Sequence, residues 1–373
     1  MFVIRRAKIE DVGTLLKLAK MVHFINLPAD KDIISQKVNH SRNCFRSCVS
    51  GKKASGDSRR GSGITGLGDA LTQSELFMFV LEDVETGSCL GSSQIVAKMG
   101  GPENPNVSFK LERREFFSRS LQKGETHVVA RLHLDESSPS EIGGLILQPS
   151  YRGHRLKLGR FLSLIRFHLV GLYPERFSTR IVAEMMAPIT ADGHNLLWDY
   201  LGRRFINLSY EEADRFCQYS REFMISLLPR EDLYLSLLPP VARAVVGEVG
   251  PETVPARRML ENLGFKYHDT IDPFDGGPHL EARADEITLV AATKRGTYSG
   301  TATVKECNTQ AMISTFDKDD EFRAIDTPAR IDDKGRVRLP RVGAQALGLE
   351  EGQALGYTPY PNVKKPARKR GSK

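Results

Sequence analysis

The chain has 373 residues, of which 40% are hydrophobic and 27% charged, with 53 basic against 46 acidic side chains. This composition is ordinary for a soluble globular protein, and the length allows two or three domains with a sizeable core. The first residues lack the apolar stretch of a signal peptide, and no run of about eighteen apolar residues predicts a membrane span. Five scattered cysteines predict free thiols, so we expect a cytoplasmic protein.

The net charge of +7 could suggest a nucleic-acid partner, but its distribution argues against one. Residues 364–373 alone carry six basic side chains and no acidic one, which leaves the rest of the chain close to neutral. We therefore expect a disordered, solvated basic tail at 364–373, and nucleic-acid binding is not expected to be the function.

The N-terminal third predicts a strand, a helix and a hairpin. Residues 2–7 form a short apolar strand, and a helix with an apolar stripe follows Asp11, which stands at a plausible N-cap. The apolar runs 76–81 and 88–96 flank an acidic turn that ends in glycine, and this pattern predicts a β-hairpin.

Strands and helices alternate in the middle of the chain. A buried strand at 142–147 leads into a basic, glycine-containing loop at 152–159, and a long apolar helix follows at 161–170. Residues 180–186 predict the next strand. This alternation favours an α+β fold with a mixed sheet.

A helix–glycine–strand pattern occurs twice farther along the chain. The first copy predicts a helix at 195–201 and a strand at 204–208. The second predicts a helix at 256–263 and a strand that starts at Phe265. Two such copies suggest an internal duplication.

The character of the chain changes after about residue 295. Residues 331–340 and 347–356 predict short strands around turns, which indicates a small β-barrel-like module at 296–363. In front of the module we place two further units, at 1–140 and 141–295.

The basic loop has the chemistry of an anion site. A strand that delivers a glycine-containing loop onto a helix N-terminus presents free backbone N–H groups and the positive end of the helix dipole to a phosphate. Basic side chains would add charge-assisted contacts, although a solvated surface turn is the alternative. The candidate ligands are Arg152, Gly153, Arg155, Lys157 and Gly159.

The loop resembles the pyrophosphate loop of the GNAT (GCN5-related N-acetyltransferase) enzymes, with Lys157 where that family usually has a glycine. Longer sequence motifs, spread over roughly residues 1–290, resemble those of the arginine N-succinyltransferase family. These motifs are Phe79–Asp83 with Glu85–Gly87, Val182–Met185, Trp198 with Leu201–Gly202 and Arg204–Phe205, Pro255–Arg257 with Leu260–Glu261 and Gly264–Phe265, and Ile271–Asp272 with Phe274–Pro278 and Leu280–Glu281.

The resemblance implies tandem GNAT-like mixed-sheet units and succinyl transfer from succinyl-CoA to the α-amino group of arginine, in arginine catabolism. It implies a sheet that opens beside the CoA loop, backbone N–H groups that polarise the thioester carbonyl, and a base that deprotonates the amine. Leu145 matches a CoA-contacting leucine of the family, and we place Leu147 of the same strand in the CoA site. We expect acyl-CoA and arginine as small-molecule partners, a homo- or hetero-oligomer, and no metal.

One departure from the family concerns the catalytic histidine, which lies there in a Gly-x-Val-His-Pro stretch. This chain has Gly250 in its place, and glycine offers no side chain for proton transfer. The candidates to act instead are Glu184 and His279, with Asp275 as a contact for a cationic substrate. Each has a plain alternative: a paired structural acid for Glu184, an exposed loop side chain for His279, and routine turn chemistry for Asp275.

Three other functions stay open at this point. The absent histidine would suit a catalytically silent, CoA-binding partner subunit, and an acyltransferase for another amine is equally compatible with the residues. Residues 333–340 with 347–352 are similar to the barrels of AbrB-type transcription factors, which would suit DNA binding. A structural β-barrel appendage, which the resembled family also carries, satisfies the same match.

Overall fold

The computed structural model describes residues 1–21, 27–51, 74–102, 104–190, 192–217 and 220–360, so the predicted tail at 364–373 lies outside the described residues. The strands are β1 Phe2–Arg6, β2 Leu76–Asp83, β3 Ser88–Val96, β4 Asn106–Ser118, β5 Lys123–Asp135, β6 Ser140–Leu147, β7 Arg180–Glu184, β8 Leu233–Tyr234, β9 Lys266–Ile271, β10 Pro278–Arg283, β11 Lys294–Thr301, β12 Thr309–Phe316, β13 Phe322–Ile331, β14 Arg336–Leu339 and β15 Ala354–Pro359. The helices are α1 Val12–Ala19, α2 Lys31–Ser50, α4 Leu158–Leu172, α5 Arg203–Ile206, α6 Tyr210–Cys217, α7 Glu222–Leu227, α8 Pro240–Arg243, α9 Val254–Glu261, α10 Thr288–Ala292 and α11 Arg341–Leu347. None of the helices within these ranges is long and apolar enough to cross a membrane. All five cysteines are free thiols, as predicted.

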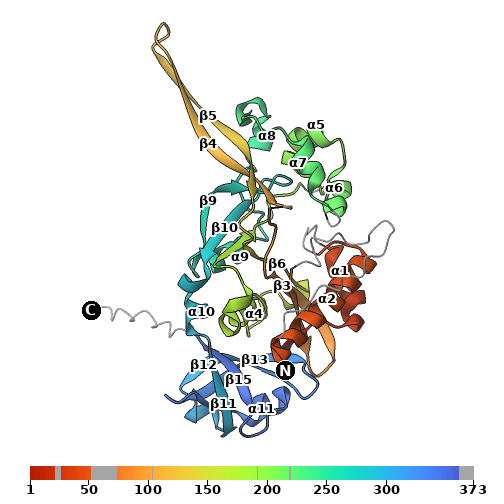
Figure 1. The fold of residues 1–373 in the computed structure, drawn as a ribbon, viewed down its shortest axis with the longest axis vertical. Coiled ribbons are helices and arrows are strands. Elements are labelled where there is room, and N and C mark those ends of the chain that lie inside the picture. The colour runs from red at the N-terminus through yellow and green to blue at the C-terminus, as the bar shows by residue number, and fades with distance from the viewer. Residues whose placement is uncertain (22–26, 52–73, 103, 191, 218–219, 361–373) are drawn as a thin grey trace, which may run out of the picture.

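One continuous hydrogen-bonded sheet runs the length of the molecule (Figure 1). Its order is β12-β15-β11-β14-β13-β1-β2-β3-β6-β7-β10-β9-β4-β5-β8. Most neighbouring strands are antiparallel, but β6 and β7 run parallel, so the predicted mixed α+β sheet is confirmed. Two separate GNAT-like units are not apparent in this continuous sheet, and the tandem arrangement, like the proposed domain boundaries, stays a prediction.

The C-terminal strands close on themselves. An additional pairing between β12 and β13 joins the ends of the run β12-β15-β11-β14-β13, which makes a closed five-stranded barrel. The barrel lies at the opposite end of the molecule from the long β4–β5 hairpin (Figure 1). The predicted β-barrel-like module is therefore confirmed, although α11 occupies part of the stretch for which the sequence predicted only strands.

The central helix α4 packs on β3 and β6 and also contacts the barrel strands β11 and β15. Its sequence is mostly apolar, and twelve of its side chains are buried, as expected for a helix covered on most sides. His168, fully buried on α4, joins helix and barrel through two hydrogen bonds of 2.6 Å, one to Thr358 Oγ1 of β15 and one to Ser314 Oγ of β12.

The carboxylate of Asp11 does not cap α1, contrary to its predicted role. Asp11 does directly precede the helix, but its oxygens accept from Arg5 Nη1 and Nη2 at 2.7 and 2.9 Å and from the Lys8 N–H at 2.7 Å. A buried guanidinium holds an acceptor more strongly than a helix N–H does, because the hydrogen bond is charge-assisted.

The predicted strand at 204–208 is wrong. A π-helical turn at Trp198–Gly202 continues directly into α5. The fully buried Trp198 ring stacks on Phe274 with 4.8 Å between centroids, and its Nε1 donates to the Leu208 carbonyl. A Cβ on Gly202 would lie 2.4 Å from the Trp198 ring, so this glycine serves close packing and does not end the helix. The second copy is confirmed by α9 and β9, but without a strand in the first copy the duplication loses its support.

The longest strands of the sheet, β4 and β5, were not predicted from the sequence. They pair along their whole length, from Asn106 opposite Asp135 to Ser118 opposite Lys123, and project from the body as an arm (Figure 1). Much of the arm is solvent-exposed, and Phe117 and Leu121 near its tip are 64% and 76% exposed. A strand with solvent on both faces lacks the alternation of apolar and polar residues by which strands are predicted.

Candidate acyl-CoA site

The sheet opens between β6 and β7. These parallel strands pair only at their starts, Ser140 with Ile181 and Glu141 with Val182. Beyond these two pairs, β6 and β7 are not paired with each other, although each stays paired with its other neighbour, β3 and β10 respectively. The following part of each strand instead lines a pocket of about 660 Å³. The resemblance implied an opening of this kind beside the CoA loop.

A β-bulge lies in the β6 wall of the pocket. The register with β3 shifts between the pairs Ser92–Ile146 and Gln94–Gly143, so two residues of β6, Gly144 and Leu145, oppose Ser93 alone. Gly144 has a φ of 56°, which a residue with a Cβ rarely adopts. Because a bulge leaves backbone groups without ladder partners, it supplies free donors and acceptors beside the pocket.

The basic loop leads from β6 to the N-terminus of α4, as predicted. Lys157 precedes the helix in a left-handed conformation with φ 52°, and its carbonyl accepts the first helical bond, from the Phe161 N–H at 3.1 Å. The N–H groups of Leu158, Gly159 and Arg160 therefore have no acceptor within the helix. This helix end can hold an anion with its dipole and its backbone donors together.

Most of the predicted CoA ligands surround this pocket. Leu145 and Leu147 line it from β6, and the loop and helix residues Arg152, Gly153, Lys157 and Gly159 line it as well. Arg155 is exposed and lies outside the lining. Arg152 Nη1 donates to Glu252 Oε2 at 3.1 Å, which links the loop to the segment before α9.

The opposite wall is largely apolar and comes from β7, the residues directly after it, and α9. Its lining side chains include Met185, Met186, Ala256, Met259 and Leu260. A basic helix N-terminus beside apolar walls suits a ligand that carries phosphates at one end and an uncharged arm behind them.

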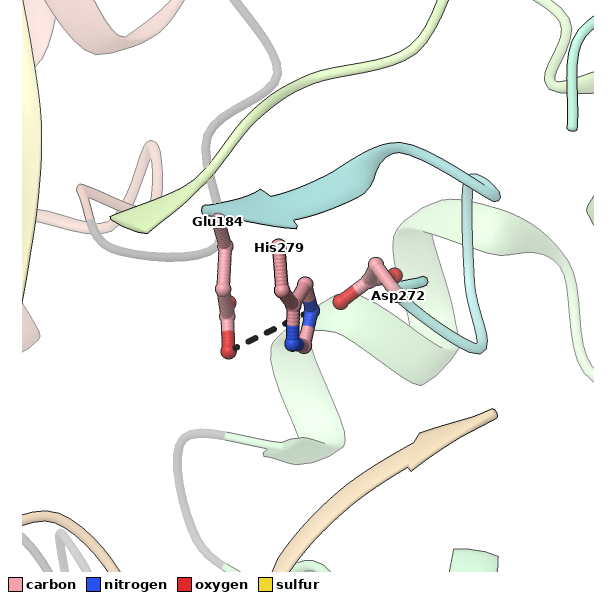
Figure 2. A group of neighbouring side chains, drawn as sticks. All are labelled: Glu184, Asp272 and His279. Atoms are coloured by element: carbon pink, nitrogen blue, oxygen red, sulfur yellow. Dashed lines mark ion pairs between the residues drawn. The ribbon is translucent and has the colours of Figure 1, made fainter. Parts of the chain in front are cut away.

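Glu184 and His279 lie together, although 95 residues separate them in the sequence. They are direct partners across the antiparallel β7–β10 ladder, and His279 Nε2 is 3.9 Å from Glu184 Oε1. Asp272 completes the group, and one ligand atom from each residue lies within 4.8 Å of the others (Figure 2). Glu184 also lines the pocket, whereas His279 is 3% exposed and its Nε2 has no hydrogen-bond partner among the described residues.

The environment moves both ionisation equilibria toward the neutral forms. Burial, with a further contribution from the Asp272 charge, raises the pKa of Glu184 to about 7. Burial also lowers the pKa of His279, since an imidazolium loses its hydration there. A carboxyl group with a pKa near neutrality is suited to take up and release a proton under ordinary conditions.

Asp275 is buried and outside the pocket lining. Its Oδ2 accepts from the Ala187 N–H at 2.9 Å and its Oδ1 from the Gly277 N–H at 2.7 Å. Both carboxylate oxygens are therefore hydrogen-bonded to backbone N–H groups. Burial raises the pKa of Asp275 to about 7. Its predicted contact with a cationic substrate stays a prediction.

Gly250 lies against the backbone that follows β7. Its N–H donates to the Met186 carbonyl at 2.9 Å, and Glu252 and Thr253 just beyond it line the pocket. A Cβ at this position would meet the Ala187 carbonyl oxygen at 3.1 Å, a tight contact. Position 250 therefore lies beside the pocket.

Two residues of this region, Asp272 and Arg166, were not predicted as site residues from the sequence. Asp272 stands in one of the family-like motifs, but nothing local showed that β9 and β10 would bring it to Glu184. Arg166 lines the pocket from α4. The signal that could have found it is a single charged side chain in the mostly apolar run 161–170.

Comparison with known proteins agrees with this arrangement. The family model for the arginine N-succinyltransferase beta subunit matches residues 63–289, more than half of the chain. The arginine N-succinyltransferase of Yersinia pestis (strain Pestoides F) is 32% identical over 289 residues, which are 75% of this chain and 80% of the relative. That of Enterobacter sp. (strain 638) is 29% identical over 330 residues, 87% of this chain and 88% of the relative. The solved structure of arginine/ornithine succinyltransferase subunit AI from Pseudomonas aeruginosa superposes with a TM-score of 0.75 at 26% identity, and the match covers 96% of this chain and 98% of that one. The chain belongs to the arginine N-succinyltransferase family.

Proposed function

We propose that this chain transfers the succinyl group of succinyl-CoA to the α-amino group of arginine, in arginine catabolism. The observation that carries the proposal is the pocket between β6 and β7. It joins a helix N-terminus suited to anions to Glu184, a partly buried carboxyl group whose pKa is raised to about 7. Family membership supports the same reaction.

The donor binds with its phosphates at the N-terminus of α4. Arg152 and Lys157 supply positive charge there, and Gly153 and Gly159 let the backbone approach the phosphates closely. Arg155, on the solvent side of the loop, attracts the phosphates from outside the pocket. The arm of CoA lies against Leu145 and Leu147 in the opened sheet, and the backbone at the bulge faces the thioester.

Glu184 is the base in this proposal. It takes a proton from the ammonium group of arginine, and the free amine attacks the thioester carbon. The new C–N bond forms as the C–S bond breaks. The nitrogen loses its second proton as it becomes an amide, and the departing thiolate of CoA takes that proton up. Glu184 then releases its proton to solvent through the pocket before the next turnover. His279, the second catalytic candidate, places a neutral imidazole beside the carboxyl group.

A catalytically silent, CoA-binding subunit is the second candidate, because Gly250 stands where the family has its histidine. A third candidate is an acyltransferase for another amine, since the Pseudomonas aeruginosa relative is described as acting on arginine or ornithine. These candidates differ from the main proposal in turnover or in acceptor, not in the CoA site.

We also propose that the protein forms an oligomer and is located in the cytoplasm. A homo- or hetero-oligomer is supported by the exposed Phe117 and Leu121 on the arm, which are large apolar side chains in contact with solvent. A cytoplasmic location is supported by the free thiols. A closed barrel that packs on α4 favours a structural appendage over a DNA-binding module.

The test is free-thiol release by the purified chain, with succinyl-CoA or acetyl-CoA as donor and arginine, ornithine or lysine as acceptor. We expect arginine-dependent release from succinyl-CoA, with succinylarginine as the product by mass spectrometry. Thiol release with ornithine or lysine but not with arginine would mean that the acceptor is that other amino acid. No release with any pair, while CoA still binds, would reject catalysis in favour of the silent subunit.

A further inference from the structure

Arg166 is a buried charge in the wall of the acyl-CoA pocket. It lies on α4, is 3% exposed, and lines the pocket together with Ser163 and Gly143. Its Nε donates to the Ser163 carbonyl at 2.9 Å and its Nη2 to Ser163 Oγ at 2.7 Å, while Nη1 reaches the Gly143 carbonyl at 3.5 Å. All three acceptors are uncharged.

The other buried arginines of the described residues each have a carboxylate partner. They pair as Arg5 with Asp11 and Glu82, Arg6 with Glu321, and Arg176 with Glu75. Arg166 has no carboxylate partner in the described part of the chain. Burial alone, with no nearby acid to oppose it, lowers its pKa to about 9. A buried charge without a counter-charge is costly, so a ligand that supplies the negative charge would be strongly favoured.

The position of Arg166 separates it from the phosphate end of the pocket. It follows Leu158, the first residue of α4, by eight residues, which places it about 12 Å along the helix axis from the anion site. It lies instead beside β6 at Gly143, directly before the bulge. A succinyl donor has its second anionic group, the free carboxylate of the acyl chain, at the far end of the molecule from its phosphates.

We propose that Arg166 binds the free carboxylate of the succinyl group and so selects succinyl-CoA over donors with an uncharged acyl chain. This inference rests on the proposed function, because it takes succinyl-CoA as the donor. A guanidinium has five N–H groups, and the contacts above use three of them. The two that remain, one on each Nη, are the pair that can hold both oxygens of a carboxylate. Ser163 fixes the orientation of this fork.

The first test uses the unmodified protein and needs no acceptor. Equilibrium binding of succinyl-CoA is compared with that of butyryl-CoA, which has a methyl group in place of the carboxylate. Losing one partner of a buried, hydrogen-bonded charge pair corresponds to roughly 30-fold or more in affinity. We expect at least that preference for succinyl-CoA, and equal affinities would overturn the proposal.

The second test compares Arg166→Met with a matched control, Arg160→Met, which removes an arginine from the loop end of the same pocket. We expect Arg166→Met to abolish the preference for succinyl-CoA over butyryl-CoA in binding and in thiol release. Arg160→Met should weaken both donors alike, because both carry the same phosphates. A preference that survives in folded Arg166→Met would refute the assignment.

These readouts separate this inference from the proposed function. Preferential binding of succinyl-CoA that depends on Arg166, without any thiol release, would reject catalysis and keep the carboxylate site. Thiol release with arginine, without a preference for succinyl-CoA that depends on Arg166, would keep the proposed catalysis and reject the carboxylate site. If Arg166→Met does not fold, Arg166→Lys keeps the charge without the fork, and a reduced preference is then the expected result.

Discussion

Glu184 and His279 occupy opposite positions on the paired strands β7 and β10, with 3.9 Å between Oε1 and Nε2. The pairing matters because the two strands meet where the sheet opens, so the carboxyl group also borders the pocket. The distance exceeds a hydrogen bond, and the histidine nitrogen has no other partner among the described side chains. The proposed base and a neutral imidazole are therefore held side by side at the edge of the pocket.

Replacement of Glu184 by Gln should lower kcat by roughly 100-fold or more while leaving the affinity for acyl-CoA nearly unchanged. The reason is that Gln keeps the shape of the side chain and loses its basicity. In the wild type the base works only when deprotonated, and its pKa is raised to about 7. The rate should therefore fall about tenfold for each pH unit below 7 and level off above it. Turnover of Glu184→Gln at the wild-type level would make Glu184 a structural acid.

A histidine introduced at position 250 should restore turnover to the Glu184→Gln variant. The position borders the pocket, and its φ is not in the left-handed region, so a side chain is allowed after a shift of a few tenths of an ångström at the Ala187 carbonyl. Gly250→Ala in the same background tests the contact without the imidazole and should stay inactive. If both double variants are equally inactive, position 250 does not reach the reacting groups in this chain.

Removal of divalent cations should leave thiol release unchanged. Glu184, Asp272 and His279 offer two carboxylates and an imidazole at distances that could hold a metal ion, so the expected absence of a metal needs a direct check. Activity is measured after dialysis against EDTA, and bound metal by elemental analysis. A loss of activity that Zn²⁺ or Mn²⁺ restores would contradict the expected absence of a metal and identify the three residues as metal ligands.

The sequence predicted best what lies within one short stretch. The strand before the loop, the loop with Lys157 and Gly159, and the helix after it are consecutive, so local patterns sufficed to predict this strand–loop–helix order. The encounter of Glu184 with His279 depends instead on the pairing and register of β7 and β10, which no local pattern records. Helix α5 was mistaken for a strand because its conformation follows from the packing of Trp198 against Phe274, a contact between distant segments.

Replacement of Gly159 by Pro should weaken CoA binding at least tenfold. Proline removes one of the free N–H groups at the N-terminus of α4, where the phosphates are proposed to bind. Gly159→Ala is the matched control, since it keeps the N–H and its Cβ would meet the Leu147 side chain at an ordinary 3.7 Å. Affinity is measured by calorimetry with CoA. Equal CoA affinities in the two folded variants would mean that the phosphates do not bind at this end of the helix.

His168 should make the stability of the protein fall on acidification. Burial lowers the pKa of His168 to about 3, whereas an exposed histidine has a pKa near 6.5. Above pH 6.5 neither the folded nor the unfolded state binds the proton. Between pH 6.5 and about 3 only the unfolded state does, so the free energy of unfolding decreases by up to about 1.4 kcal/mol per pH unit from this residue.

The control for this effect is His168→Gln, whose side chain can still bond Ser314 or Thr358 between α4 and the barrel but does not titrate. Unfolding by urea is followed from pH 7.5 to 5, and the variant should have the shallower dependence on pH, by about one proton at the acidic end. The comparison of slopes isolates the titration from the loss of the contact itself, because a lost hydrogen bond lowers stability equally at every pH. Identical slopes for the two proteins would show that His168 takes up its proton in the folded state and that the contact between α4 and the barrel tolerates the charge.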